Sequence, residues 1–150
     1  MIEIQRTNSE NKDFIDLVRF LDADLAIRDG EDHAFYSQFN RLDQINYVVL
    51  AYEDGKPVGC GAIKEYEPLV MEVKRMFVLP ECRGKGIASK VLQELENWAG
   101  ELEFEKCTLE TGVKQPEAIG LYQKNGYHFI PNYGQYEDVK ESVCFEKVLG

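Results

Sequence analysis

A chain of 150 residues with 44% hydrophobic content is expected to form one domain, 1–150, with a sizeable core rather than to remain disordered. Its formal net charge of −10 argues against a nucleic-acid partner, because binding to phosphates requires a basic footprint. No apolar run approaches the ~20 residues of a membrane-spanning helix, and residues 1–14 lack the zones of a signal peptide, so a cytoplasmic protein without a membrane partner is expected.

The first part of the sequence predicts one strand and two helices. Residues 2–6 alternate apolar and polar side chains, which is typical of a strand. Asn11 or Ser9 can cap the helix that follows, and residues 33–40 predict a second, short helix. The apolar positions of the first helix fall on one face and are Phe14, Ile15, Val18, Leu21 and Leu25.

A three-stranded meander is predicted next, followed by a crossover. Two apolar runs within 46–67 flank Asp54-Gly55, a pair that is typical of a hairpin turn. Residues 69–79 predict a long third strand, antiparallel to its neighbour. Helical spacing over 85–99 and a strand over 106–111 complete a strand–helix–strand unit, which places two parallel strands in the sheet.

The last part predicts a helix and two strands. The segment 115–126 predicts the helix, with Pro116 in its first turn and Gly126 just past its end. Strands are expected at 127–130 and 142–149. Together the elements predict an α/β fold of the α+β type, with a mixed, mostly antiparallel sheet covered by helices on both faces.

The turn between strand 69–79 and helix 85–99 is basic and rich in glycine. Residues 72–90 contain five basic and two acidic side chains, which is unusual in so acidic a chain. A helix N-terminus presents unpaired N–H groups and the positive end of the helix dipole, and glycines allow a ligand to approach the backbone. The turn therefore predicts a site for a phosphate-bearing ligand, with Arg83 and Lys85 at its rim.

Three phosphate-binding motifs compete for this turn. A P-loop is excluded because its glycine-to-lysine spacing is missing. A dinucleotide fingerprint fits Gly84 and Gly86, but Ser89 takes the place of the third glycine, and the turn follows an antiparallel meander. The pattern [QR]-x-x-G-x-[GA] is satisfied by Arg83, Gly86 and Ala88.

Two segments carry a resemblance to a known family. "RMFVLPECRGKGIASKVL" resembles the acetyl-CoA-binding segment of the GNAT superfamily of N-acyltransferases, and "AIGLYQKNGY" resembles its later motif. "LETGVKQPEAIGLYQKNGY" is similar to small bacterial members. The resemblance implies a central parallel pair of strands that splay apart, a monomer or homodimer, and acetyl transfer from acetyl-CoA to the primary amine of a small molecule by direct attack.

The resemblance also implies a set of site residues. Main-chain N–H groups of the turn would bind the pyrophosphate, strand residues would pair with the pantetheine arm and supply an oxyanion donor, and a polar side chain would meet the pantetheine. The implied cofactor-binding residues are Met76, Phe77, Val78, Arg83, Gly84, Lys85, Gly86, Ile87, Ala88, Ser89 and Gln115.

Tyr122 and Glu72 are the implied catalytic residues. The phenol of Tyr122 would protonate the leaving thiolate, and Glu72 would deprotonate the amine, usually through water. Glu110 or a water chain could replace Glu72 as the base. Lys74 and Arg75 are expected on opposite faces of their strand, so that at most one of them faces the ligand.

The sequence leaves the acceptor open. Its candidate site residues are Tyr36, Phe39, Tyr66, Tyr133 and Tyr136, and residues 130–138 predict a loop over the cleft. A CoA-binding sensor without turnover, a protein-lysine or N-terminal acetyltransferase, and a nicotinamide-nucleotide binder remain alternative functions.

No metal site is expected, because two histidines and four widely spaced cysteines form no ligand motif. Cys82 has no evident base, so it is expected to be an incidental thiol.

Overall fold

The structure is a computed structural model that describes residues 1–29 and 45–150, and the helix predicted over 33–40 lies outside this part of the chain. Its strands are β1 (Ile2–Thr7), β2 (Tyr47–Glu53), β3 (Lys56–Glu67), β4 (Val70–Val78), β5 (Lys106–Gly112), β6 (His128–Ile130) and β7 (Ser142–Val148). Its helices are α1 (Lys12–Asp29), α3 (Ile87–Glu101) and α4 (Pro116–Lys124), with short 3₁₀ turns at Pro80–Cys82 and Gly134–Tyr136.

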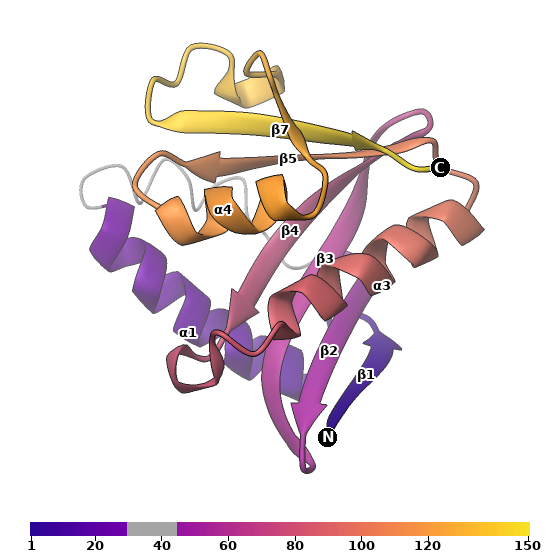
Figure 1. The fold of residues 1–150 in the computed structure, drawn as a ribbon, viewed down its shortest axis with the longest axis vertical. Helices are drawn as coiled ribbons and strands as arrows, with labels where there is room; N and C mark the ends of the chain where they lie inside the picture. Colours follow the sequence, from indigo (N-terminus) through magenta and orange to yellow (C-terminus); the bar gives the residue numbers. More distant parts are fainter. Residues whose placement is uncertain (30–44) are drawn as a thin grey trace.

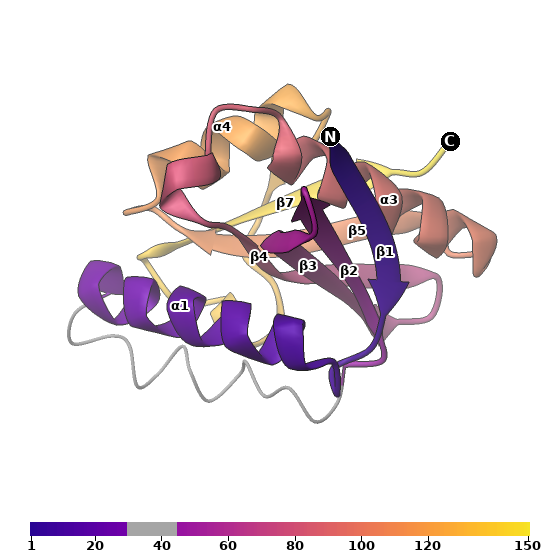
Figure 2. The same cartoon turned by 90° about the horizontal axis from the view of Figure 1, so that it is seen from below.

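The described strands form one seven-stranded sheet in the order β1-β2-β3-β4-β5-β7-β6. Helix α1 covers one face, and α3 and α4 cover the other, as the view in Figure 2 makes plain. Every neighbouring pair is antiparallel except β4 and β5. The predicted mixed, mostly antiparallel sheet with helices on both faces is therefore confirmed.

The parallel pair at the centre of the sheet is only partly joined. β4 and β5 pair over Val70–Glu72 and Lys106–Thr108, and beyond these residues they diverge (Figure 1). The expected splay is thus present. It leaves the part of β4 after Glu72 without a strand partner on its β5 side among the described residues.

Local sequence signals account for several of the element ends. The side chain of Asn11 caps α1, because its Oδ1 accepts hydrogen bonds from the backbone N–H groups of Asp13 (2.8 Å) and Phe14 (3.3 Å). In the β2–β3 hairpin, Asp54 has φ 52° and Gly55 has φ 84°, the left-handed pair that a tight hairpin turn requires. Both predictions are confirmed.

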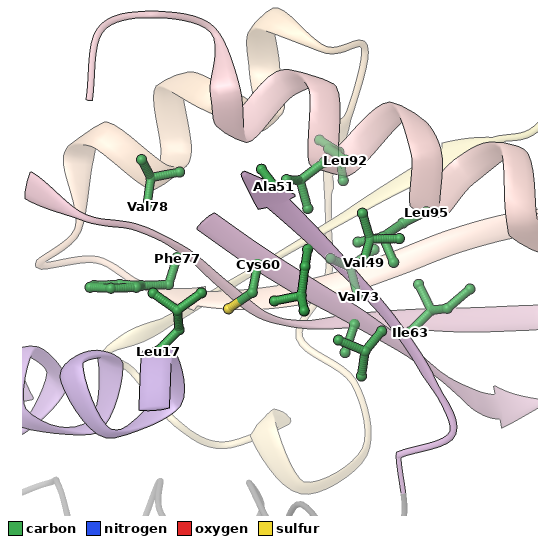
Figure 3. Packing of buried hydrophobic residues seen from close by; sticks show 14 of the residues in the cluster. Leu17, Val49, Ala51, Cys60, Ile63, Val73, Phe77, Val78, Leu92 and Leu95 are labelled. Atoms are coloured by element: carbon green, nitrogen blue, oxygen red, sulfur yellow. The ribbon is translucent and has the colours of Figure 1, made fainter. Parts of the chain in front are cut away.

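The core lies on both faces of the sheet. Leu17 of α1 packs towards Phe77 on one face, and Leu92 and Leu95 of α3 pack against the strands on the other (Figure 3). Helix α3 buries one stripe of side chains, and these are Ile87, Val91, Leu92, Leu95 and Ala99. Burial of this stripe fixes the start of α3 beside the end of β4.

A β-bulge interrupts β4 in its second half. Cys60 pairs with Phe77 and Ala62 pairs with Lys74, so Arg75 and Met76 together lie opposite Gly61. Arg75 has φ 60°, a left-handed conformation that is uncommon for a residue with a side chain. The extra residue changes which side chains of β4 face each side of the sheet.

Replacing Gly61 with alanine is expected to destabilise the fold by about 1–3 kcal/mol, the usual cost of overpacking a core. A β-carbon at Gly61 would lie 2.5 Å from Met76 Sδ and 2.9 Å from side-chain atoms of both Leu95 and Val91. Urea unfolding measures the change. Gly100→Ala is the matched control, because its β-carbon meets no described atom within 4 Å and alanine favours the helix by up to ~1 kcal/mol. Equal stability of the two variants would contradict the prediction.

Candidate active site

A cavity of about 470 Å³ opens where β4 and β5 diverge. It is lined from both faces of the sheet, by Leu21 and Asp24 of α1 on one side and by the starts of α3 and α4 on the other. The predicted site residues that line it are Glu72, Met76, Phe77, Val78, Arg83, Gly84, Gly86, Ile87, Ala88, Ser89, Gln115 and Tyr122. Of the predicted cofactor-binding and catalytic residues, Lys85 is the one that the lining does not include, and of the predicted acceptor residues that the structure describes, Tyr136 lines the cavity whereas Tyr66 and Tyr133 do not.

The glycine-rich turn forms one wall of the cavity. Gly84 and Gly86 have φ of 83° and 80°, which residues with side chains rarely adopt. Helix α3 begins at Ile87, two residues later than predicted, and its first backbone bond runs from Lys90 N–H to Gly86 O at 3.2 Å. The N–H groups of residues 87–89 therefore belong to the first turn of the helix, where an anion can accept from them.

The two cations of the turn are held differently. Arg83 donates from Nε to Val78 O at 2.9 Å, and its guanidinium lies over the Phe77 ring, 5.6 Å from the centroid. Arg83 is thereby fixed against the end of β4. Lys85 instead forms an ion pair with Glu53 of β2, 3.2 Å from Nζ to Oε1.

The end of α4 fixes Tyr122 in the cavity wall. Gly126 has φ 91°, and the N–H groups of Gly126 and Tyr127 bond to the carbonyls of Gln123 (3.2 Å) and Tyr122 (3.0 Å). This is the Schellman arrangement that ends many helices, and it usually brings two apolar side chains together. Here the rings of Tyr122 and Tyr127 meet at 5.7 Å. The glycine-aromatic pair of "LYQKNGY" therefore orients the tyrosine four residues before it.

The surroundings of Tyr122 keep its phenol protonated. Burial raises the pKa of Tyr122 well above its ordinary value, and the negative charge of Glu110 raises it further. A phenol in this state is a proton donor at neutral pH. Because Tyr122 also lines the cavity, it can donate to a group bound there.

Glu72 is a buried residue that also lines the cavity, and two side chains hold it. Tyr133 donates its hydroxyl hydrogen to Glu72 Oε2 at 2.6 Å, and Lys74 Nζ lies 3.4 Å from Oε1. Burial raises the pKa of the Tyr133 phenol, and the neighbouring Glu72 raises it further. Each oxygen of the Glu72 carboxylate therefore accepts a hydrogen bond from one of these side chains.

The loop from 131 to 141 carries two of the predicted acceptor residues. Besides the bond from Tyr133 to Glu72, Asn132 Nδ2 donates to Val139 O and Ser142 O, both at 3.0 Å, and Tyr136 lines the cavity. Tyr66 of β3 packs on the Tyr133 ring at 4.9 Å. Tyr136 is thus the residue of the predicted loop that lines the cavity. Of the other acceptor candidates, Tyr36 and Phe39 lie outside the described residues.

Comparison with known proteins identifies the family to which this fold belongs. The model of the acetyltransferase (GNAT) family matches residues 13–127. The chain belongs to the GNAT acetyltransferase family. The resemblance carried by the glycine-rich turn and "LYQKNGY" is confirmed, and with it the prediction of an acetyl-CoA-dependent N-acetyltransferase.

Similar members of the GNAT family are known from sequence and structure. The chain is 39% identical over 102 residues to an IAA acetyltransferase of Azospirillum brasilense, an alignment that spans 67% of each chain. A crystal structure described as an acyl-CoA N-acyltransferase of Klebsiella pneumoniae is 30% identical, with a TM-score of 0.84, and the match covers 100% of this chain and 99% of that one. PaiA N-acetyltransferase of Thermoplasma acidophilum, solved with coenzyme A, shares the fold at a TM-score of 0.71 and 18% identity, with 99% of each chain covered.

Two structural features of this GNAT chain concern metals and membranes. Within 1–29 and 45–150, no group of three or more histidine, cysteine, aspartate or glutamate residues is arranged to hold a metal ion. None of the helices described is long and apolar enough to cross a bilayer. Cys82 is a buried free thiol that lines the cavity.

One prediction about the strand β4 of this GNAT site is wrong. Lys74 and Arg75 were expected on opposite faces, yet both line the cavity, because the bulge at Arg75 breaks the alternation of β4. A glycine inside a neighbouring strand, Gly61, was the available signal for such a bulge. The contributions of Leu21 and Asp24 were also missed, since they depend on where α1 docks.

Proposed function

We propose that this GNAT chain transfers the acetyl group of acetyl-CoA to the primary amine of a small molecule by direct attack. The observation that carries the proposal is that one cavity joins an anion-binding turn, a protonated tyrosine and a buried carboxylate. The turn and the tyrosine lie on the α3 and α4 side of the sheet, and Glu72 is held by Tyr133. These are the three groups that acyl transfer to an amine requires.

The donor would occupy the side of the cavity next to α3 and α4. The N–H groups of residues 87–89 would bind the pyrophosphate at the helix N-terminus, with the positive φ of Gly84 and Gly86 allowing close approach. The pantetheine arm would pair with the free edge of β4 at residues 76–78 and reach Gln115. An N–H group of the same segment would face the thioester oxygen.

The reaction balances in three steps. Glu72 accepts a proton from the ammonium form of the acceptor, which has an unperturbed pKa near ~10 and is otherwise unreactive at neutral pH. The free amine attacks the thioester carbon, and the oxyanion accepts a hydrogen bond from the β4 backbone. The carbon–sulfur bond then breaks, Tyr122 protonates the thiolate, the second amine proton restores the phenol, and Glu72 releases the first proton to solvent. The products are an N-acetyl amide and CoA with a free thiol.

The loop that carries Tyr133 and Tyr136 supports a small acceptor. Tyr133 reaches Glu72 directly, and Tyr136 lines the same cavity. Side chains of this loop therefore occupy the space beside the proposed base. That arrangement suits a compact amine better than an extended polypeptide laid across an open groove.

Gly86→Ala is expected to weaken acetyl-CoA binding by about tenfold or more, because a β-carbon there would stand where the pyrophosphate must approach the backbone. Gly55→Ala is the matched control. Gly86 and Gly55 have φ of 80° and 84°, and among the described atoms none lies within 4 Å of a β-carbon at either position. The two variants share the left-handed strain, ~1–2 kcal/mol, so calorimetry with acetyl-CoA isolates the ligand effect. Equal affinities would contradict the proposed turn.

The proposed function is tested by following free thiol from acetyl-CoA while a panel of amines is screened. Release that depends on the amine, together with an N-acetyl product, is the expected result. A chain that binds acetyl-CoA in calorimetry but releases no thiol with any amine would instead be a CoA-binding module. Acetylation of peptides but not of small amines would favour a protein acetyltransferase.

A further inference from the structure

Arg75 is a buried cation in the wall of the proposed active site. Its side chain is 5% exposed, and the residue lines the cavity. Arg75 Nη1 donates to Asp22 Oδ1 at 2.9 Å, while Arg75 Nε is buried and has no hydrogen-bond partner among the described residues. A guanidinium carries five N–H donors, so this one is poorly satisfied for a buried charge.

The backbone of Arg75 adopts an unfavourable conformation that brings its side chain to the cavity. The residue takes φ 60° at the bulge opposite Gly61, and without the bulge it would alternate away from the side chain of Lys74. Strained residues of this kind cluster at functional sites. Asp22 does not explain the arrangement by itself, because its side chain is 50% exposed and could reach a surface cation as easily.

The cavity that Arg75 lines also contains carboxylate side chains. Glu72 lies three residues earlier on β4, and Asp24 and Glu110 also line the cavity. Lys74, the cation next to Arg75 on β4, already has a partner, because it pairs with Glu72 at 3.4 Å. The cavity therefore has carboxylates that suit an amine and a guanidinium whose Nε lacks a partner in the described part of the chain. Glu72 and Arg75 are separated along the strand by ~10 Å of backbone.

We propose that the acceptor carries a carboxylate as well as its primary amine, and that Arg75 binds this carboxylate. The inference rests on the proposed acetyl transfer and narrows its acceptor to compounds of the amino-acid class. The planar fork of a guanidinium matches a carboxylate in a way that an ammonium does not. Arg75 thus determines specificity, while Glu72 and Tyr122 act on the reacting atoms.

The test uses acceptor pairs that differ in one group. Glycine, β-alanine and γ-aminobutyrate are each compared with the corresponding amide, and thiol release from acetyl-CoA gives kcat/KM. For at least one spacing, the acid is expected to exceed its amide by about 10- to 100-fold, the range for a hydrogen bond to a charged group. The spacing that gives the largest ratio measures the distance from Arg75 to the reacting amine.

Variants at position 75 assign the preference to the guanidinium. In Arg75→Gln the ratio of acid to amide is expected to fall to about one, and Arg75→Lys is expected to restore part of it because the charge returns without the fork. Thermal melting and acetyl-CoA calorimetry check that each variant is folded and binds the donor. Asp22→Asn, which removes the competing anion, is expected to keep or increase the ratio.

A binding experiment separates this inference from the proposed function. The same acids and amides are titrated by calorimetry into the protein saturated with CoA, which reads the carboxylate contact without turnover. Acids that bind without any thiol release would overturn the acetyl transfer and leave the anion site standing. Amides that bind and react as well as their acids, or an Arg75→Gln variant that weakens both equally, would overturn the inference about Arg75.

Discussion

Replacing Tyr122 with phenylalanine is expected to lower kcat by about 10²–10⁴-fold, the usual contribution of a general acid, and to leave acetyl-CoA binding intact. The phenol is buried and its pKa is raised, so it stays protonated through neutral and mildly alkaline pH. Phenylalanine keeps the ring contacts with Tyr127 (5.7 Å) and Phe145 (6.0 Å). The change therefore removes the proton donor with little effect on packing.

Thiol release measures turnover for this variant, and calorimetry measures donor affinity. Tyr127→Phe is the matched control, because it deletes a hydroxyl from a second buried tyrosine of the same cluster. That hydroxyl donates to Glu96 Oε2 at 3.0 Å, away from the residues that line the cavity. The control is expected to lose about 1 kcal/mol of stability while kcat changes little. Normal turnover in Tyr122→Phe would refute the role of general acid.

Glu72→Gln is expected to lower kcat/KM by about 10²-fold or more near neutral pH, and the loss should shrink as the pH rises. An alkyl amine with pKa near ~10 is almost wholly protonated at pH 7. Without a base, only the deprotonated fraction reacts, and that fraction rises tenfold per pH unit below the amine pKa. Glutamine preserves the shape of the side chain and an oxygen for the Tyr133 hydroxyl, which lies 2.6 Å from Oε2.

Glu110→Gln is the comparison that decides between the two candidate bases. Glu110 also lines the cavity, and its Oε2 accepts from Ser142 Oγ at 2.7 Å. If Glu72 is the base, the pH-rate profile of Glu110→Gln keeps the shape of the parent profile. A steep rise with pH in Glu110→Gln, with a flat profile in Glu72→Gln, would transfer the role to Glu110. Parent-like profiles in both variants would favour a water chain.

Most of the fold could be predicted because its signals are local. The Asp54-Gly55 turn and Gly126 at the end of α4 fix element ends through backbone conformations that few residues adopt, and Asn11 fixes the start of α1 through its side chain. The exceptions are set by distant pairings. The bulge at Arg75 depends on packing opposite Gly61 of β3, and no alternation rule within β4 can reveal it.

The residues of the candidate site also fall into those that local sequence signals predict and those that distant contacts bring together. The glycine-rich turn and "LYQKNGY" are continuous motifs, so their residues could be named from the sequence. The bond from Tyr133 to Glu72 joins residues 61 positions apart through an irregular loop, which has no periodicity to read. Lys85 was predicted at the ligand because of its charge, yet it pairs with Glu53 of β2, a partner that only the folded sheet supplies.

The gap between β4 and β5 has a consequence for the order of events in catalysis. The cavity is lined by α1 on one face of the sheet and by α3 and α4 on the other, so the gap joins the two faces. In the proposed reaction, donor and acceptor enter from opposite faces and neither blocks the route of the other. In that reaction a ternary complex would assemble in either order, and the acetyl group would pass from donor to acceptor in one displacement, without an acylated form of the protein.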